Sequence, residues 1–169
     1  MRQRTAITLL ALAAIFLLAG CSHLSVRHLK RQPWSLETVQ VLEMKFWRFE
    51  YAATPGTDTF LVRGRAYPTD AVPAWAGWVQ DLWLESYLAD TSGEVIAKDL
   101  RLYQPRDLEH DKGLYFEFTL RPDRLGDPGQ LFLTFGYRMK LTESRPDAED
   151  QDEDTGRVFF ASEGALTRL

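Results

Sequence analysis

Apolar and polar positions alternate along much of the chain with a period of two, which is typical of β-strands with one buried face. The alternation is clearest over residues 130–141, where the predicted inner face carries Leu131, Leu133, Phe135, Tyr137, Met139 and Leu141. Residues 114–120 repeat the pattern, and Phe116 and Phe118 are expected to point inward. These stretches predict strands rather than helices.

The remaining clear strands are predicted over residues 59–67, 79–89, 94–103 and 157–161. Asp-Thr-Ser-Gly at residues 90–93 is the strongest turn signal in the chain, so the strands on either side of it are expected to form a hairpin. Gly64 inside a strand indicates a bulge or a close neighbour. Residues 68–77 and 121–129 are predicted connections, because proline and small residues are frequent there.

Residues 37–53 are ambiguous. Val39, Leu42, Phe46 and Phe49 would suit one face of a helix, whereas an alternating pattern requires the apolar face to switch twice. The density of β-branched and aromatic residues favours a strand with a bulge or a bend. Residues 54–58 then form a turn by composition.

These elements predict an all-β fold. About seven strands joined by turns, with no long helical period, favour an antiparallel β-sandwich with an immunoglobulin-like or transthyretin-like layout. Five Trp, six Tyr and ten Phe suit such a fold. We expect residues 34–169 to form this single domain.

The first twenty-one residues have a different character. Arg2 and Arg4 precede an apolar run over residues 5–18, two small residues and the only cysteine of the chain, Cys21. This is the order of a secretory signal, and the run is shorter than the roughly 20 residues of a spanning helix. An uncleaved membrane helix is the alternative. Leu18-Ala19-Gly20-Cys21 resembles the lipobox of bacterial lipoproteins.

The resemblance implies that residues 1–20 are a signal peptide, cut between Gly20 and Cys21. It also implies that the sulfur of Cys21 carries a diacylglycerol and that its amine is acylated; no other cofactor is expected. Ser22, rather than Asp, follows the cysteine. The resemblance therefore implies an outer-membrane anchor facing the periplasm, with the inner membrane as the alternative.

Charge and cysteine content limit the partners of the mature chain. Arg2 and Arg4 leave with the signal, so the net charge changes from −4 to −6, which disfavours nucleic acid as a partner. Without a second thiol the domain has no internal disulfide. Residues 21–33 are predicted to be a lipidated tether whose cations either attract anionic headgroups or belong to a plain solvated spacer. Trp34 is expected to contact the domain.

Catalytic and metal-binding motifs are weak. His110, between Glu109 and Asp111, is the only histidine outside the tether, and no G-x-S-x-G or zinc-ligand spacing accompanies it. We therefore expect no enzyme, with a periplasmic hydrolase as the least favoured reading. In the acidic run over residues 147–154, Asp150, Asp152 and Asp154 match the first EF-hand positions. Thr155 and Ala161 do not match the later ones, so this calcium site is a weak candidate beside a solvated loop.

The aromatic cluster Trp75, Trp78 and Trp83 is the strongest interface candidate, since tryptophan is enriched at binding hot spots. The alternative is that these indoles plug one end of the domain. The sequence thus predicts a non-catalytic interaction or assembly module that binds an envelope protein. A module that binds a glycan, a lipid or calcium is the alternative.

Overall fold

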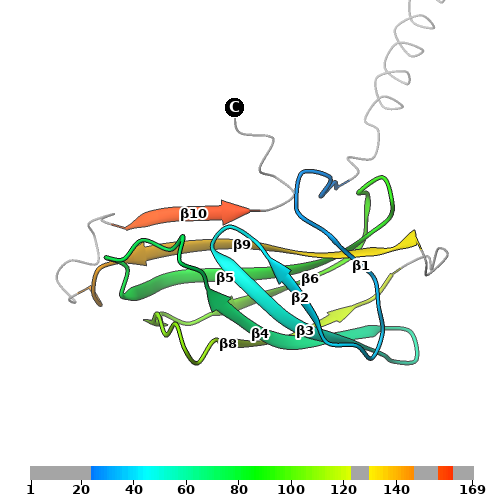
Figure 1. Cartoon of the computed structure of the whole chain (residues 1–169), viewed down its shortest axis with the longest axis horizontal. Coiled ribbons are helices and arrows are strands. Elements are labelled where there is room, and N and C mark those ends of the chain that lie inside the picture. Colours follow the sequence, from blue (N-terminus) through cyan, green and yellow to red (C-terminus); the bar gives the residue numbers. More distant parts are fainter. Residues whose placement is uncertain (1–23, 123–129, 147–155, 162–169) are drawn as a thin grey trace, which may run out of the picture.

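The computed structural model describes residues 24–122, 130–146 and 156–161, and in them the chain forms two antiparallel sheets and no helix (Figure 1). The strands are β1 (Gln32–Pro33), β2 (Gln40–Glu43), β3 (Trp47–Pro55), β4 (Phe60–Pro68), β5 (Trp78–Ala89), β6 (Val95–Tyr103), β7 (Arg106–Asp107), β8 (Leu114–Leu120), β9 (Phe132–Thr142) and β10 (Arg157–Ala161). The predicted all-β class is confirmed. Residues 1–23, 123–129, 147–155 and 162–169 lie outside the described residues, and so do the signal-peptide, lipidation and calcium predictions that fall on them.

The larger sheet has six strands in the order β1-β9-β5-β6, with β10 also paired to β9 and β7 to β5. Since β5 lies along one edge of β9, β1 and β10 share its other edge. The smaller sheet has four strands in the order β2-β3-β4-β8. The inner faces of the two sheets share one hydrophobic core.

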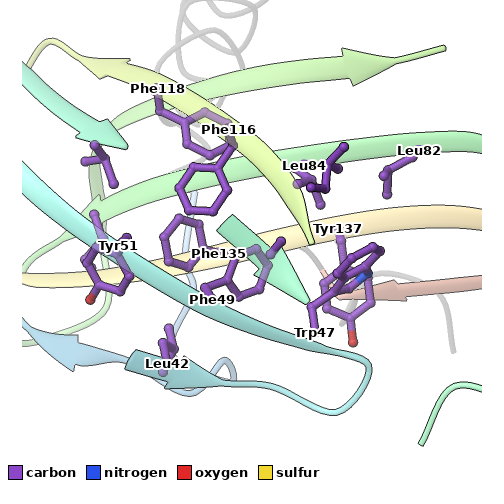
Figure 2. Close-up of a cluster of buried hydrophobic side chains, with 14 of the residues drawn as sticks. Leu42, Trp47, Phe49, Tyr51, Leu82, Leu84, Phe116, Phe118, Phe135 and Tyr137 are labelled. Atoms are coloured by element: carbon purple, nitrogen blue, oxygen red, sulfur yellow. The ribbon is translucent and has the colours of Figure 1, made fainter. Parts of the chain in front are cut away.

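Phe135 of β9 lies at the centre of this core (Figure 2). Its ring stacks on Phe49 of β3, with centroids 4.2 Å apart, and contacts Phe116 and Phe118 of β8 at 5.4 and 6.2 Å. Phe49 and Phe116 also pack edge to face. Aromatic rings from both sheets therefore hold the two layers together, through buried area and favourable ring geometry.

The predicted inner faces are confirmed where alternation was clearest. All six predicted inner positions of residues 130–141 are buried, as are Phe116 and Phe118. The predicted hairpin is also confirmed, because β5 and β6 pair in antiparallel fashion. Asp90 closes its turn by accepting hydrogen bonds from the Ser92 hydroxyl and the Glu94 amide, and Gly93 adopts a positive φ of 85°.

The prediction of one bent strand over residues 37–53 is wrong. The chain reverses there, and β2 pairs with β3 across a tight turn in which the Met44 amide donates to the Trp47 carbonyl. The two switches of the apolar face mark this reversal. The expected number of about seven strands and the immunoglobulin-like or transthyretin-like layout are not confirmed. Short strands such as β1 and β7, of two residues each, are too brief for a period-two signal.

Residues 24–33, the described part of the predicted tether, lie against the six-stranded sheet. Val26 is fully buried and forms a small cluster with Tyr87 and Ala89, on the face of β5 opposite the main core. Trp34 follows and packs edge to face on Phe60, as expected, with centroids 5.1 Å apart. The apolar side chains of this segment explain why it packs instead of extending into solvent.

One edge of the two-layer arrangement is closed by side chains. Alternate residues of β6 point toward β8, where the Asp99 carboxylate accepts from the Thr119 amide at 2.7 Å. Arg101 Nε donates to the Glu117 carbonyl at 2.8 Å. The Tyr103 hydroxyl donates to the Tyr115 carbonyl at 3.1 Å. These three hydrogen bonds, the β6–β8 edge contact, join two strands that belong to different sheets.

Candidate interaction surfaces

The three predicted interface tryptophans lie in different environments. Trp75 is partly buried against the main core, with the Arg157 guanidinium 5.3 Å above its ring centre. Trp78 begins β5, and its buried Nε1 has no hydrogen-bond partner among the described residues. Trp83 is 41% exposed in the middle of β5. The structure therefore does not bring the three indoles together in one flat patch.

Trp83 instead belongs to an apolar row that crosses the outer face of the six-stranded sheet. In register across the strands, Trp83 pairs with Leu102 of β6 on one side and with Arg138 of β9 on the other, and Arg138 pairs with Phe160 of β10. Leu100 lies two residues from Leu102 on the same face. We call Trp83, Leu100, Leu102 and Phe160 the outer patch; each side chain is between 39% and 65% exposed.

Basic side chains accompany the outer patch. The Arg138 guanidinium lies 5.2 Å from the centre of the Trp83 ring and forms an ion pair with Asp81. Lys140 pairs in register with Val158, which is also exposed, and Lys98 is exposed on β6. The patch thus combines apolar side chains with Arg138, which lies between Trp83 and Phe160, and has lysines nearby.

The outer face of the four-stranded sheet differs, because it contains a shallow hollow of about 370 Å³ that opens to solvent. We call this the outer hollow; its lining residues are Val39, Glu50, Tyr51, Ala52, Arg63, Gly64, Arg65, Tyr67 and Tyr115. The short side chain of Ala52, in register with Arg63, leaves its floor low. A Cβ on Gly64 would lie 2.0 Å from the Glu50 carbonyl oxygen, so the predicted close neighbour of this glycine is confirmed.

Arginine and tyrosine side chains form the walls of the outer hollow. Arg63 is paired with the Glu117 carboxylate at 2.9 Å, and Glu117 also accepts from the Tyr115 hydroxyl. Arg65 donates through Nη1 to the carbonyls of Lys112 and Gly113, which carry no charge. The hollow therefore presents a guanidinium held by neutral acceptors beside an exposed tyrosine, which is a suitable arrangement for an anionic or planar polar group.

The remaining candidates show no further site within the described ranges. His110 is exposed in the loop between β7 and β8. Beside it, the hydrogen bond from Lys112 lowers the pKa of Glu109. Across residues 24–122, 130–146 and 156–161, no three His, Cys, Asp or Glu side chains gather in a way that could hold a metal ion. Gly20, Cys21, Asp150, Asp152 and Asp154 lie outside those ranges.

In the part of the chain that the structure describes, no helix has the length and apolar character needed to span a membrane.

The sequence interpretation named Trp83 but missed the rest of the outer patch and the whole outer hollow. The outer patch depends on Leu100 and Leu102, whose exposure follows from the inward direction of Asp99, Arg101 and Tyr103 toward β8. The sequence did contain a signal, because Leu100 and Leu102 alternate with charged residues. This alternation does not tell whether the leucines or the charged residues face inward. The Arg63-Gly64-Arg65 spacing was the available signal for the outer hollow.

Comparison with known proteins gives no relative: no family matches the sequence, and no curated protein or solved structure shows significant similarity to it.

Proposed function

We propose that this chain is a lipid-anchored bacterial envelope protein whose β-sandwich domain acts as a non-catalytic interaction module. Residues 1–20 are its signal peptide, and Cys21 carries the diacylglycerol and the N-acyl chain. The anchor lies in the outer membrane with the domain facing the periplasm; the inner membrane is the alternative. The lipobox resemblance at residues 18–21 supports this placement.

The outer hollow is the single observation that carries the interaction role. Arginine and tyrosine are enriched at the residues that dominate binding energy, and here Arg63, Arg65, Tyr67 and Tyr115 meet in one open depression. The partner is an envelope protein that places an acidic or carbonyl-bearing segment against Arg65. Such a group would gain a charge-assisted hydrogen bond that the neutral carbonyls of Lys112 and Gly113 do not supply.

Glycan binding in the same hollow is the second candidate. Tyr115 is 53% exposed and lies beside the Arg63–Glu117 ion pair. An aromatic ring flanked by an arginine and a carboxylate can stack on a sugar and hydrogen-bond its hydroxyl groups. The two candidates share the residues of the outer hollow and differ in the molecule that is captured there.

Crosslinking in intact cells tests the interaction role. A photo-crosslinking residue would replace Tyr115 or Val39 in the acylated protein, with Thr57, exposed in the β3–β4 turn, as the matched control. We expect one dominant protein adduct at Tyr115 and Val39 that is absent at Thr57 and lost with Arg65→Ala. Equal adducts at all three positions would contradict the proposal. A shift of the adduct to peptidoglycan fragments would favour the glycan candidate.

The anchor is tested separately. The wild-type chain should incorporate an alkyne-tagged fatty acid and fractionate with membranes, whereas Cys21→Ser should lose both properties. Wild-type protein that stays in the membrane fraction without incorporating the label would contradict lipid anchoring and favour an uncleaved helix.

A further inference from the structure

The chain enters the fold on the side of the six-stranded sheet. Leu24 accepts a hydrogen bond from the Val95 amide, and the Val26 amide donates to the Gly93 carbonyl, both at 2.9 Å. These contacts fix residues 24–26 beside the tip of the β5–β6 hairpin (Figure 1). Val26 then packs on Tyr87, whose side chain is on the same outer face of β5 as Trp83.

Covalent geometry limits the distance between the anchor and this entry point. Three Cα–Cα steps separate Cys21 from Leu24, so these two residues are at most about 11 Å apart. A lipid on Cys21 would therefore hold the hairpin tip and the outer face of the six-stranded sheet close to the lipid headgroups. The packing of residues 24–33 removes the slack that a free tether of the same length would provide.

The outer patch has the composition of a membrane-contact surface. Its row from Leu102 through Trp83 to Phe160 crosses four neighbouring strands and is about 15 Å wide, given strand spacings of about 4.8 Å. Tryptophan prefers the boundary between headgroups and acyl chains, where one side of the indole is apolar and the other wet. Leucine and phenylalanine supply apolar area that enters the same zone.

Cations on the same side favour an anionic lipid surface. Arg27 and Lys30 are exposed in the packed segment, and Lys98 is exposed near the outer patch. Of the nearby acids, Asp81 is paired with Arg138 and Glu85 accepts a hydrogen bond from Tyr87. Asp90, at the hairpin tip, accepts from the Ser92 hydroxyl and the Glu94 amide. Lysine and arginine side chains near an anionic membrane surface are attracted to it.

We propose that the outer patch rests in the headgroup region of the membrane that holds Cys21, so that the six-stranded sheet lies on the bilayer and the outer hollow faces away from it. This inference depends on the proposed lipid anchor. It identifies the lipid surface, rather than a protein, as the occupant of the outer patch, and it leaves the partner to the opposite face.

Spin labelling of the full-length acylated protein tests this orientation. Cys21 is the only cysteine, and its thioether-linked lipid leaves it unreactive, so Leu102→Cys, Phe160→Cys or Tyr115→Cys each provide one labelling site. Each labelled protein would be reconstituted into vesicles of phosphatidylethanolamine and phosphatidylglycerol. Collision with a water-soluble nickel chelate and with oxygen would then be measured by paramagnetic resonance, and circular dichroism would check folding.

We expect labels at positions 102 and 160 to lose accessibility to the nickel chelate and gain accessibility to oxygen on reconstitution. The matched label at position 115, in the outer hollow, should remain accessible to the chelate. If the protein stays on the vesicles but positions 102 and 160 remain accessible to the chelate, the proposed orientation is wrong and the anchor still holds. Spin–spin broadening at position 102 would overturn it in favour of a second copy. Loss of the acylated protein from vesicles would overturn both proposals.

Discussion

The outer faces of the two sheets follow the same alternation yet carry opposite surfaces. On the six-stranded sheet, large apolar side chains such as Trp83 and Leu102 fill the outward positions and project from the sheet. On the four-stranded sheet, the short Ala52 side chain leaves a depression. Its walls include Arg63, which is ion-paired with Glu117, and Arg65, which donates to backbone carbonyls. The inner faces are alike, because both pack into one core. Inward positions therefore specify the fold, whereas outward positions are free to differ in function.

Phe135→Ala should destabilise both sheets, because this ring packs between them. The Phe135 ring contacts aromatic residues of β3 and β8 and is fully buried, so its loss leaves a cavity between the sheets. We expect the free energy of unfolding to fall by about 3–5 kcal/mol, measured by urea denaturation. Phe160→Ala, on the outer patch, is the control and should change it by less than about 0.5 kcal/mol. Equal losses would show that Phe160 is not a surface residue.

Gly64→Ala should destabilise the four-stranded sheet at the β3–β4 pairing. The new Cβ would meet the Glu50 carbonyl at 2.0 Å and the Tyr51 Cα at 2.8 Å, and both are backbone atoms that cannot move aside easily. Overpacking of this kind costs about 1–3 kcal/mol, and β3 and β4 must separate to accommodate it. Urea denaturation measures the loss. Ala52→Ser, in the same hollow, is the control; a variant as stable as wild type at position 64 would contradict the close contact.

Alkaline pH should destabilise the fold by ionising the buried tyrosines that lie between the two sheets. Burial raises the pKa of Tyr103 and that of Tyr137 to about 12. Both values exceed the unfolded value of about 10, so the folded state favours the neutral phenols. Their contribution to stability is complete below pH 10 and is lost as the pH rises from 10 through 12.

Denaturation at a series of pH values, with tyrosinate absorbance followed in parallel, would measure this loss. Tyr137→Phe removes one of the titrating groups and should make the alkaline decline shallower. A free energy of unfolding that stays constant from pH 9 to 12 would contradict the raised pKa values.

Tyr51→Phe should change the stability of the core without changing binding in the outer hollow. The Tyr51 hydroxyl is buried and has no hydrogen-bond partner among the described residues, which carries a desolvation cost. Its removal should raise the free energy of unfolding by about 1 kcal/mol, visible as a higher melting temperature. Crosslinking at Tyr115 should be unchanged. A drop in stability would indicate that the hydroxyl is satisfied by water.

Alternation predicted the core well and the surfaces poorly. The burial of Phe135 follows from its own strand, since six apolar residues share one parity there. The outer patch needs three strand registers at once, because Leu102, Trp83 and Phe160 become neighbours only after β6, β5, β9 and β10 pair. The outer hollow likewise needs Ala52 opposite Arg63 and Arg65 opposite Tyr115. Pairing between distant segments is not written in any local pattern.

Residues 24–33 illustrate a second limit. Their basic side chains predicted a tether that either attracts headgroups or is a solvated spacer, and neither alternative foresaw that Val26 is fully buried on Tyr87. The segment is short and mixed, so its few apolar residues form no periodic signal. Their position follows from contacts with distant residues: Val26 packs on Tyr87, and the backbone of residues 24–26 hydrogen-bonds to Gly93 and Val95.

The β6–β8 edge contact has a consequence for the behaviour of the protein at high concentration. A strand edge with unpaired amides and carbonyls is a template on which other chains can add and grow into fibrils. Here Asp99, Arg101 and Tyr103 occupy the outward amide and carbonyls of β8, at Thr119, Glu117 and Tyr115. Copies crowded together thus meet a blocked edge at β8, and self-association into aggregates is disfavoured on that side.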